Sequence, residues 1–179
     1  MNLQSSRTTM FVLIGLLFLT TSSVYAETAE EYVKRGIANG KKGNFTQLIS
    51  DCTKAIEINP NYARAYYCRG YAYYQQGNLI QAISDFTKTV EINPYPEAYY
   101  YRGRAYLDQG NSTQAISDFT KTIEICPNYA AAYYDRGHVY YKIKEYDKAW
   151  ADMHKAEAFG WEFEPKFLNS LKKESRRDK

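Results

Sequence analysis

Three cysteines and two histidines carry the most reactive side chains in this 179-residue sequence: Cys52, Cys68, Cys126, His138 and His154. A cysteine beside a histidine base could act as a nucleophile, so Cys68 or Cys126 with His138 is a candidate pair. However, Cys126 precedes Pro127 at a predicted helix end, and no residue is evident that would orient the base. The sequence has no Cys-x-x-Cys pair, and two histidines give no recognisable zinc frame. We therefore expect no catalytic residue, no metal and no cofactor.

The odd number of cysteines limits the disulfides that can form. At least one of the three must stay free or pair with another chain. Cys52 and Cys68 fall on helices that are predicted to be neighbours, so a bridge between them is one interpretation. The favoured interpretation is that both are small, buried, apolar side chains.

The sequence lacks the motifs of common enzyme classes. There is no Gly-rich phosphate loop, no Gly-x-Ser-x-Gly and no His-Glu-x-x-His. The net charge is +3, from 23 basic and 20 acidic residues, which is too close to neutral for a protein whose main partner is nucleic acid. With 45% hydrophobic and 24% charged residues, the composition is that of a folded globular chain. These observations favour a folded protein that is not an enzyme and does not bind nucleic acid.

Residues 1–26 have the order of a secretory signal peptide. Arg7 is followed by an apolar run over residues 10–19 and then by a polar stretch that ends in Val24-Tyr25-Ala26. This run is shorter than the ~20 residues that a membrane-spanning helix needs, so cleavage after Ala26 is favoured over a retained anchor. We expect an exported chain, periplasmic or extracellular, without stable membrane insertion after cleavage.

A repeat of about 34 residues organises the rest of the chain. Residues 65–94 agree with residues 98–127 at 22 of 30 positions. Arg-Gly pairs recur at steps of 34, 33 and 34 residues. These pairs are Arg35-Gly36, Arg69-Gly70, Arg102-Gly103 and Arg136-Gly137. Repetition at this period indicates an array of small units, each too small to form a core alone.

Within each unit the pattern predicts two helices. Tyr66, Gly70 and Tyr73 lie on one face of the first helix, and Gly77 can adopt the left-handed conformation that ends it. The second helix begins at an Asn followed three residues later by Gln, a spacing typical of a capping box. The three such pairs are Asn44 with Gln47, Asn78 with Gln81, and Asn111 with Gln114.

This pattern resembles the tetratricopeptide repeat (TPR) family, which has an aromatic residue, Gly and Tyr on the first helix, a Gly turn, Ala then Phe on the second helix, and a closing Pro. The resemblance covers roughly residues 29–161. It implies antiparallel helix pairs that stack into an all-α, right-handed superhelical solenoid of four units with a concave groove, to which we add a C-terminal capping helix around Phe167, Leu168 and Leu171. The expected segments are the signal peptide 1–26, units 27–62, 63–95, 96–129 and 130–161, and the capping helix with its basic tail 162–179.

Residues that recur unchanged in the units are predicted to be structural. The glycines of the Arg-Gly pairs sit inside helices, where Gly costs ~1 kcal/mol relative to Ala, so close contact between helices is expected. The arginines are predicted to pair with an Asp on the partner helix, at Asp51, Asp85, Asp118 and Asp152. The fourth unit departs from the pattern because Lys144 and Glu145 stand where the earlier units have the turn glycine.

Residues that recur in place but differ in chemistry are predicted to bind a partner. By the resemblance they line the concave groove, together with Val33 and Ile37 of the first unit. The predicted binding residues are Arg64, Tyr67, Tyr71, Tyr74, Tyr100, Arg104, Asp108, Tyr134, His138 and Tyr141. Tyrosine combines a large contact area with a hydroxyl group and dominates binding hot spots. Family members that bind acidic C-terminal carboxylates place Lys and Asn where Val33 and Ile37 stand, so that mode is not expected.

The sequence therefore predicts an exported scaffold or adaptor that binds a protein or peptide segment in a Tyr-lined groove. His138 could make this binding depend on pH near 6. A second hypothesis is a self-assembling spacer, a homo-oligomer formed through repeat ends or a disulfide. A third is a non-catalytic subunit of an envelope enzyme complex.

Overall fold

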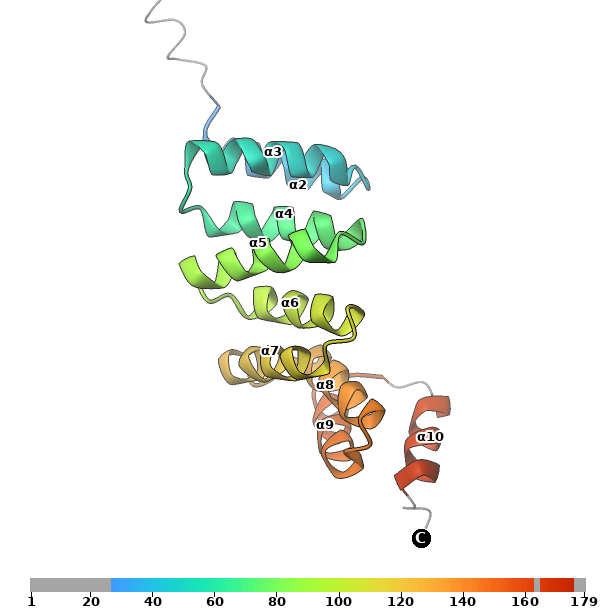
Figure 1. The fold of residues 1–179 in the computed structure, drawn as a ribbon. Coiled ribbons are helices and arrows are strands. Elements are labelled where there is room, and N and C mark those ends of the chain that lie inside the picture. The colour runs from blue at the N-terminus through green and yellow to red at the C-terminus, as the bar shows by residue number, and fades with distance from the viewer. Residues whose placement is uncertain (1–26, 163–164, 176–179) are drawn as a thin grey trace, which may run out of the picture.

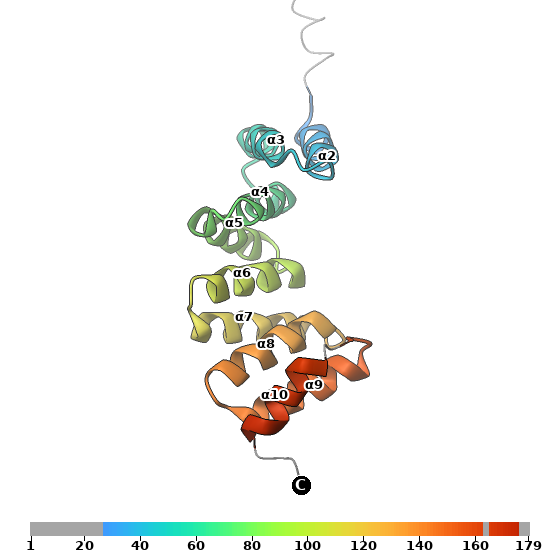
Figure 2. The same ribbon diagram turned by 90° about the vertical axis from the view of Figure 1, so that its right-hand side faces the viewer.

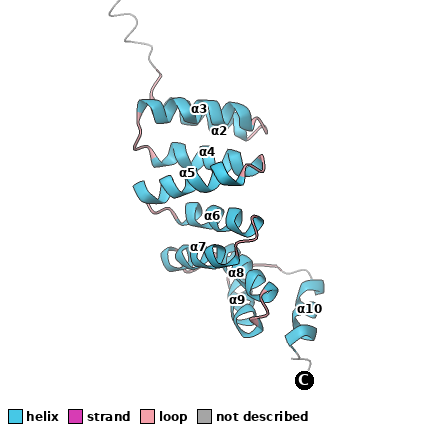
Figure 3. Cartoon of the chain, viewed as in Figure 1, coloured by secondary structure: helices cyan, strands magenta, loops and turns pink. Residues whose placement is uncertain are grey.

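A computed structural model describes residues 27–162 and 165–175, and within them every regular element is a helix (Figure 1; Figure 3). The helices are α2 (Ala29–Gly40), α3 (Phe45–Ile58), α4 (Ala63–Gln75), α5 (Leu79–Ile92), α6 (Pro96–Asp108), α7 (Ser112–Ile125), α8 (Ala130–Lys142), α9 (Tyr146–Ala158) and α10 (Pro165–Ser175). The predicted signal peptide, residues 1–26, and the end of the basic tail, residues 176–179, lie outside the described residues.

Consecutive helices pack in pairs, α2 with α3, α4 with α5, α6 with α7 and α8 with α9, and each pair packs on the next (Figure 2). The first helices of neighbouring pairs also contact each other, α2 with α4, α4 with α6, and α6 with α8. In the described part of the chain, the second helices of neighbouring pairs (α3, α5, α7 and α9) contact each other less than the first helices do. The first helices therefore lie on the inner side of the stack. This arrangement confirms the predicted right-handed solenoid of four units followed by a C-terminal helix.

Left-handed residues end the first helix of each unit. Gly43, Gly77 and Gly110 have φ angles of +80°, +76° and +81°, a conformation that glycine adopts because it has no Cβ. The fourth unit places Lys144 at this point of its turn, and Lys144 adopts the same conformation with a φ of +65°. The left-handed backbone conformation of the turn is thus kept in the fourth unit, although glycine is replaced there by Lys144.

The predicted capping boxes are only partly confirmed. Asn44 and Asn111 each accept a hydrogen bond from a backbone N–H in the first turn of their helix. Asn78 makes no such bond, and its side chain instead donates to Gln76. Gln47 does not close a box either, because its amide donates to Asp51 at 3.0 Å. Asn at these helix starts is therefore a cap in the first and third units and a turn residue in the second.

Glycine in the Arg-Gly pairs lets the two helices of a unit approach closely. A Cβ added at Gly103 would lie 2.9 Å from Cε1 of Phe119, and a Cβ at Gly70 would lie 3.1 Å from Cε1 of Phe86. Both phenylalanines are fully buried. The close contact between each glycine and the phenylalanine of the partner helix offsets the ~1 kcal/mol that Gly costs inside a helix, as the sequence predicts.

Each repeated arginine forms the predicted ion pair with the Asp of its own unit. Nε and Nη2 of Arg102 donate to the two carboxylate oxygens of Asp118, each at 2.8 Å. This bidentate geometry is the strongest form of an Arg-carboxylate pair. The same pairs form between Arg35 and Asp51, Arg69 and Asp85, and Arg136 and Asp152.

The arginines also bind the preceding unit, which the sequence analysis does not predict. Nη1 of Arg102 in α6 donates to Oγ1 of Thr87 in α5 at 3.0 Å. The equivalent bonds join Arg69 to Thr53 and Arg136 to Thr120. One guanidinium group therefore holds both helices of its own unit and the second helix of the unit before it.

The C-terminal helix α10 packs on α9. Leu171 is fully buried beside Ala149, Trp150 and Met153. The indole N–H of Trp150 donates to the hydroxyl of Ser175 at 3.0 Å. Leu171 thus covers the last unit as predicted, while the side chains of Phe167 and Leu168 lie outside the described residues.

Candidate binding groove

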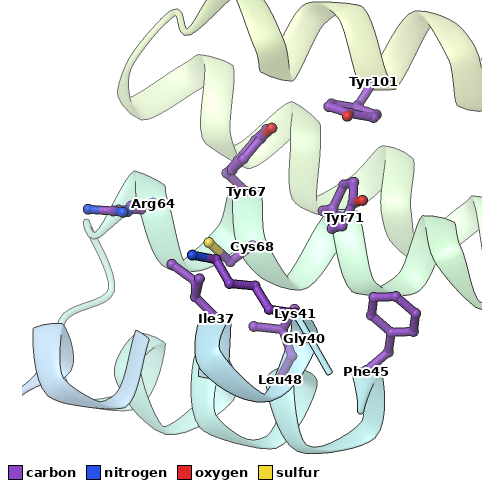
Figure 4. A pocket seen from close by; sticks show the side chains of 10 residues that line it. All are labelled: Ile37, Gly40, Lys41, Phe45, Leu48, Arg64, Tyr67, Cys68, Tyr71 and Tyr101. Carbon is purple, nitrogen blue, oxygen red and sulfur yellow. The ribbon is translucent and has the colours of Figure 1, made fainter. Parts of the chain in front are cut away.

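A pocket of about 380 Å³ opens between the first and second units, on the side of the first helices (Figure 4). Most of its lining is aliphatic or aromatic: Ile37, Phe45, Leu48, Tyr67, Tyr71 and Tyr101. The cations Lys41 and Arg64 also line it, and Gly40 and Cys68 complete the wall. The structure therefore brings three of the predicted binding residues, Arg64, Tyr67 and Tyr71, to one pocket.

Tyr101 lies at the centre of an aromatic cluster in this groove. Its ring centroid is 6.2 Å from that of Tyr67, 5.2 Å from that of Tyr71 and 6.1 Å from that of Tyr74. On its other side it stacks on Phe86, with centroids 6.1 Å apart. Burial raises the pKa of Tyr67 and of Tyr101, so both rings keep neutral hydroxyl groups at physiological pH. These hydroxyls can donate or accept hydrogen bonds from a bound segment.

The sequence predicts Tyr100 as a groove residue, but the structure places it in the core. Tyr100 is 7% exposed, and its ring packs against Phe119 and Tyr129 at centroid distances of 5.9 and 5.1 Å. Val33, at 1% exposed, is also a core residue. Consecutive residues of a helix point about 100° apart, so Tyr100 and Tyr101 face different surroundings, but two neighbouring tyrosines give no sign of which one faces the groove. No repeat signal marks Tyr101, because the position before the repeated arginine holds Lys34, Cys68 and Asp135 in the other units.

Polar side chains link α4, α6 and α8 in the middle of the groove. The Tyr74 hydroxyl donates to Oδ2 of Asp108 at 2.8 Å, and burial together with this bond raises the pKa of Tyr74 to about 12. The guanidinium of Arg104 lies 5.7 Å from the centroid of the Tyr74 ring, and its Nε is 3.9 Å from Oδ2 of Asp135. Burial raises the pKa of Asp135, although a hydrogen bond from Tyr100 and the charge of Arg104 oppose that shift. The predicted residues Tyr74, Arg104 and Asp108 thus form one connected cluster.

The remaining predicted residues lie on α8, farther along the stack. Tyr134 stacks on Trp161 with ring centroids 4.9 Å apart and on His138 with centroids 6.3 Å apart. Burial, aided by the charge of Lys142, lowers the pKa of His138. Tyr141 packs against Tyr146 with centroids 6.0 Å apart. Nine of the ten predicted residues therefore form three groups along the first helices rather than a single site, and the tenth, Tyr100, lies in the core.

All three cysteines are free thiols in the structure, and Cys52 and Cys68 are buried, as the favoured interpretation expects. Within the residues that the structure describes, no cluster of His, Cys, Asp and Glu is arranged to hold a metal ion. Among the described helices, none has the length and apolar character needed to cross a membrane.

Comparison with known sequences identifies the repeat. A family profile described as tetratricopeptide repeat matches residues 63–95, and one described as TPR repeat matches residues 103–144. The chain is a tetratricopeptide repeat protein. No curated protein sequence matches this TPR protein to a significant degree.

Solved structures with the same fold include MamA proteins. A crystal structure of MamA protein is 27% identical with a TM-score of 0.74, over 84% of each chain. MamA 41-end from Desulfovibrio magneticus RS-1 is 22% identical with a TM-score of 0.74, over 85% of this TPR protein and 86% of that chain. The first TPR of Spaghetti (RPAP3), bound to the HSP90 peptide SRMEEVD, is 24% identical with a TM-score of 0.64, over 65% of this chain and 96% of that one. The fold is that of a scaffold for protein-protein interaction.

Proposed function

We propose that this TPR protein is an exported, non-catalytic adaptor that binds a peptide or protein segment along the groove of its first helices. The pocket of about 380 Å³ between the first two units carries the proposal. Its walls are mostly aromatic and aliphatic, with Lys41 and Arg64 as the charged members, which is the usual composition of a ligand site. The first TPR of Spaghetti, which has a similar fold, is bound to the HSP90 peptide SRMEEVD.

In the proposed complex, an apolar side chain of the partner fills this pocket. It would contact Tyr71 and Tyr101, while Lys41 and Arg64 favour an acidic residue beside it. Burial of one large apolar side chain contributes about 1.5–3 kcal/mol, whereas micromolar affinity requires about 8 kcal/mol. The pocket alone therefore provides too little binding free energy. The Tyr74-Arg104-Asp108 cluster and the α8 residues Tyr134, His138 and Tyr141 must add contacts. A segment that spans several units satisfies this requirement.

Export is the second part of the proposal, and it rests on the sequence of residues 1–26. A basic residue, an apolar run and a small residue at position 26 follow the order of a cleaved signal peptide. The adaptor would then act in the periplasm or outside the cell, with Glu27 as its first residue.

The proposal is tested by affinity capture from the exported fraction with two matched variants. The groove variant combines Arg64→Glu with Tyr71→Ala, and the control combines Lys88→Glu with Ile80→Ala on α5 of the same unit, where Ile80 is 76% exposed. Each variant reverses one charge and truncates one apolar side chain, so general effects on solubility are matched. We expect the groove variant to lose at least about tenfold in partner recovery, equivalent to about 1.4 kcal/mol, while the control binds as the wild type.

Mass spectrometry of the captured material separates the alternatives. Equal recovery of one partner by both folded variants would contradict the groove assignment. Recovery of the protein itself alone, sensitive to reductant and insensitive to the groove variant, would support the self-assembling spacer instead. A recovered chain that begins before Glu27 would contradict cleavage of the signal.

A further inference from the structure

The first two interfaces between units bring together two equivalent positions. One is the residue after the repeated Asp on the second helix of a unit, and the other is the residue before the repeated Arg on the first helix of the next unit. Between the second and third units these residues are Phe86 and Tyr101, whose rings stack with centroids 6.1 Å apart. Between the first and second units the same positions hold Cys52 and Cys68. The repeat therefore places two thiols where the next interface has two rings in contact.

The surroundings of the two thiols differ in a way that suits different roles. Both belong to the same buried cluster, but Cys52 is 0% exposed and Cys68 is 7% exposed. The interaction between the two thiols raises the pKa of Cys52 and lowers that of Cys68. Burial opposes this shift of the Cys68 pKa, and the positive charge of Arg64 favours it. Cys68 is thus the better nucleophile of the two.

Access to the pair runs through the groove pocket. Cys68 is part of the pocket wall, on the same helix as Arg64, Tyr67 and Tyr71 (Figure 4). Cys52 does not line the pocket and lies on α3. A small oxidant that enters the pocket therefore meets Cys68 first and Cys52 second.

We propose that Cys52 and Cys68 are an oxidisable thiol pair, with Cys68 as the attacking sulfur and Cys52 as the resolving one, and that a hydroperoxide is the oxidant. The Cys68 thiolate attacks the peroxide oxygen, the O–O bond breaks, and Cys68 becomes a sulfenic acid while the other oxygen leaves, with a proton, as water or an alcohol. The Cys52 sulfur then attacks the sulfenic sulfur. The S–O bond breaks, and the leaving hydroxide takes the Cys52 proton to form water. Two thiols and one hydroperoxide thus give one disulfide, one water and one further water or alcohol.

The disulfide would join the first unit to the second, because Cys52 is on α3 and Cys68 is on α4. At the next interface the equivalent residues Phe86 and Tyr101 pack without a covalent bond. The bond would also change one wall of the groove pocket, so the pair couples oxidant exposure to the shape of the proposed binding surface.

The test follows the oxidation of the reduced wild-type protein by hydrogen peroxide. Samples are quenched, alkylated under denaturing conditions and mapped by mass spectrometry, with Cys126 as the internal reference thiol. We expect Cys52 and Cys68 to lose alkylation together, at least about tenfold faster than Cys126, and to appear as one cross-linked peptide that reductant restores. Slower oxidation of the pair than of Cys126, or its absence under peroxide that oxidises Cys126, would overturn the proposal.

Two variants separate the roles of the sulfurs. Cys52→Ser should leave Cys68 as a sulfenic acid that dimedone traps, because no resolving thiol remains. Cys68→Ser should leave Cys52 reduced, since Cys52 is fully buried. Oxidation of Cys52 in folded Cys68→Ser at the wild-type rate would show that the assignment of roles is wrong. No partner is needed in this experiment, so its result is independent of the proposed adaptor function.

Discussion

At the scale of single residues, repetition decides how much the sequence predicts. The Arg102-Asp118 pair could be predicted because both residues recur in every unit on helices that must touch. The bond from Arg102 to Thr87 could not, because it crosses to the preceding unit and depends on how the units stack. Tyr101 cannot be predicted as a groove residue for a related reason, since only packing distinguishes it from its neighbour Tyr100.

His138 is expected to make stability depend on pH. Burial and Lys142 lower its pKa from 6.5, so the folded protein binds fewer protons at this site than the unfolded chain does below that pH. The stability that neutral His138 contributes is complete above about pH 6.5 and is lost as the pH falls below that value. Thermal melting between about pH 5 and 8 should therefore show a lower Tm at acid pH, and His138→Gln should flatten this slope.

The matched control for this prediction is His154→Gln. His154 lies on α9 with its side chain 69% exposed, so its replacement should leave the pH dependence of Tm close to that of the wild type. The prediction would be contradicted if His154→Gln flattened the dependence of Tm on pH and His138→Gln left it unchanged.

At the scale of helices and turns, residue type at the turn and cap positions predicts most of the points where helices begin and end. Glycine at Gly77 and Gly110 predicts the left-handed turn correctly. The fourth turn shows the limit of that rule, because Lys144 adopts the same conformation without being glycine. The sequence alone does not predict a left-handed turn at Lys144, whereas the packing of α8 on α9 holds the backbone in that conformation. Asn78 shows the opposite limit, where a residue suited to capping makes no cap.

Lys144→Gly is expected to stabilise the protein. A side chain in the left-handed region costs roughly 1–2 kcal/mol through the clash of its Cβ, and glycine removes that clash at the price of a more flexible unfolded chain. The expected gain is about 1 kcal/mol in the free energy of unfolding, measured with urea. Gly110→Lys, at the equivalent turn of the third unit, is the reverse experiment and should lose a similar amount. Destabilisation by both changes would show that Lys144 makes a favourable contact that outweighs its backbone strain.

At the scale of the whole molecule, the order of units follows from the repeat, but the groove does not. A period of 34 residues predicts stacked helix pairs, whereas the pocket depends on which side chains meet at each interface. Two thiols meet between the first two units, and two aromatic rings meet between the next two. The pocket lies at the interface between the first two units, where the smaller side chains of Cys52 and Cys68 meet. Units of similar sequence thus form interfaces with different shapes.

Loss of the C-terminal cap should weaken the last unit more than the first. Leu171 is fully buried against Trp150 and Met153, and Leu→Ala changes at such positions cost about 2–5 kcal/mol. In a stacked array each unit contacts only its neighbours, so the loss should be largest where Leu171 binds and decline with distance. Hydrogen exchange of Leu171→Ala should rise most in α8 and α9 and least in α2 and α3. Asn169→Ala, on the exposed side of α10, should leave both regions unchanged. An equal rise in all units would instead show that the array opens as one cooperative body, in which the cap stabilises the groove pocket at the far end as strongly as the unit that it covers.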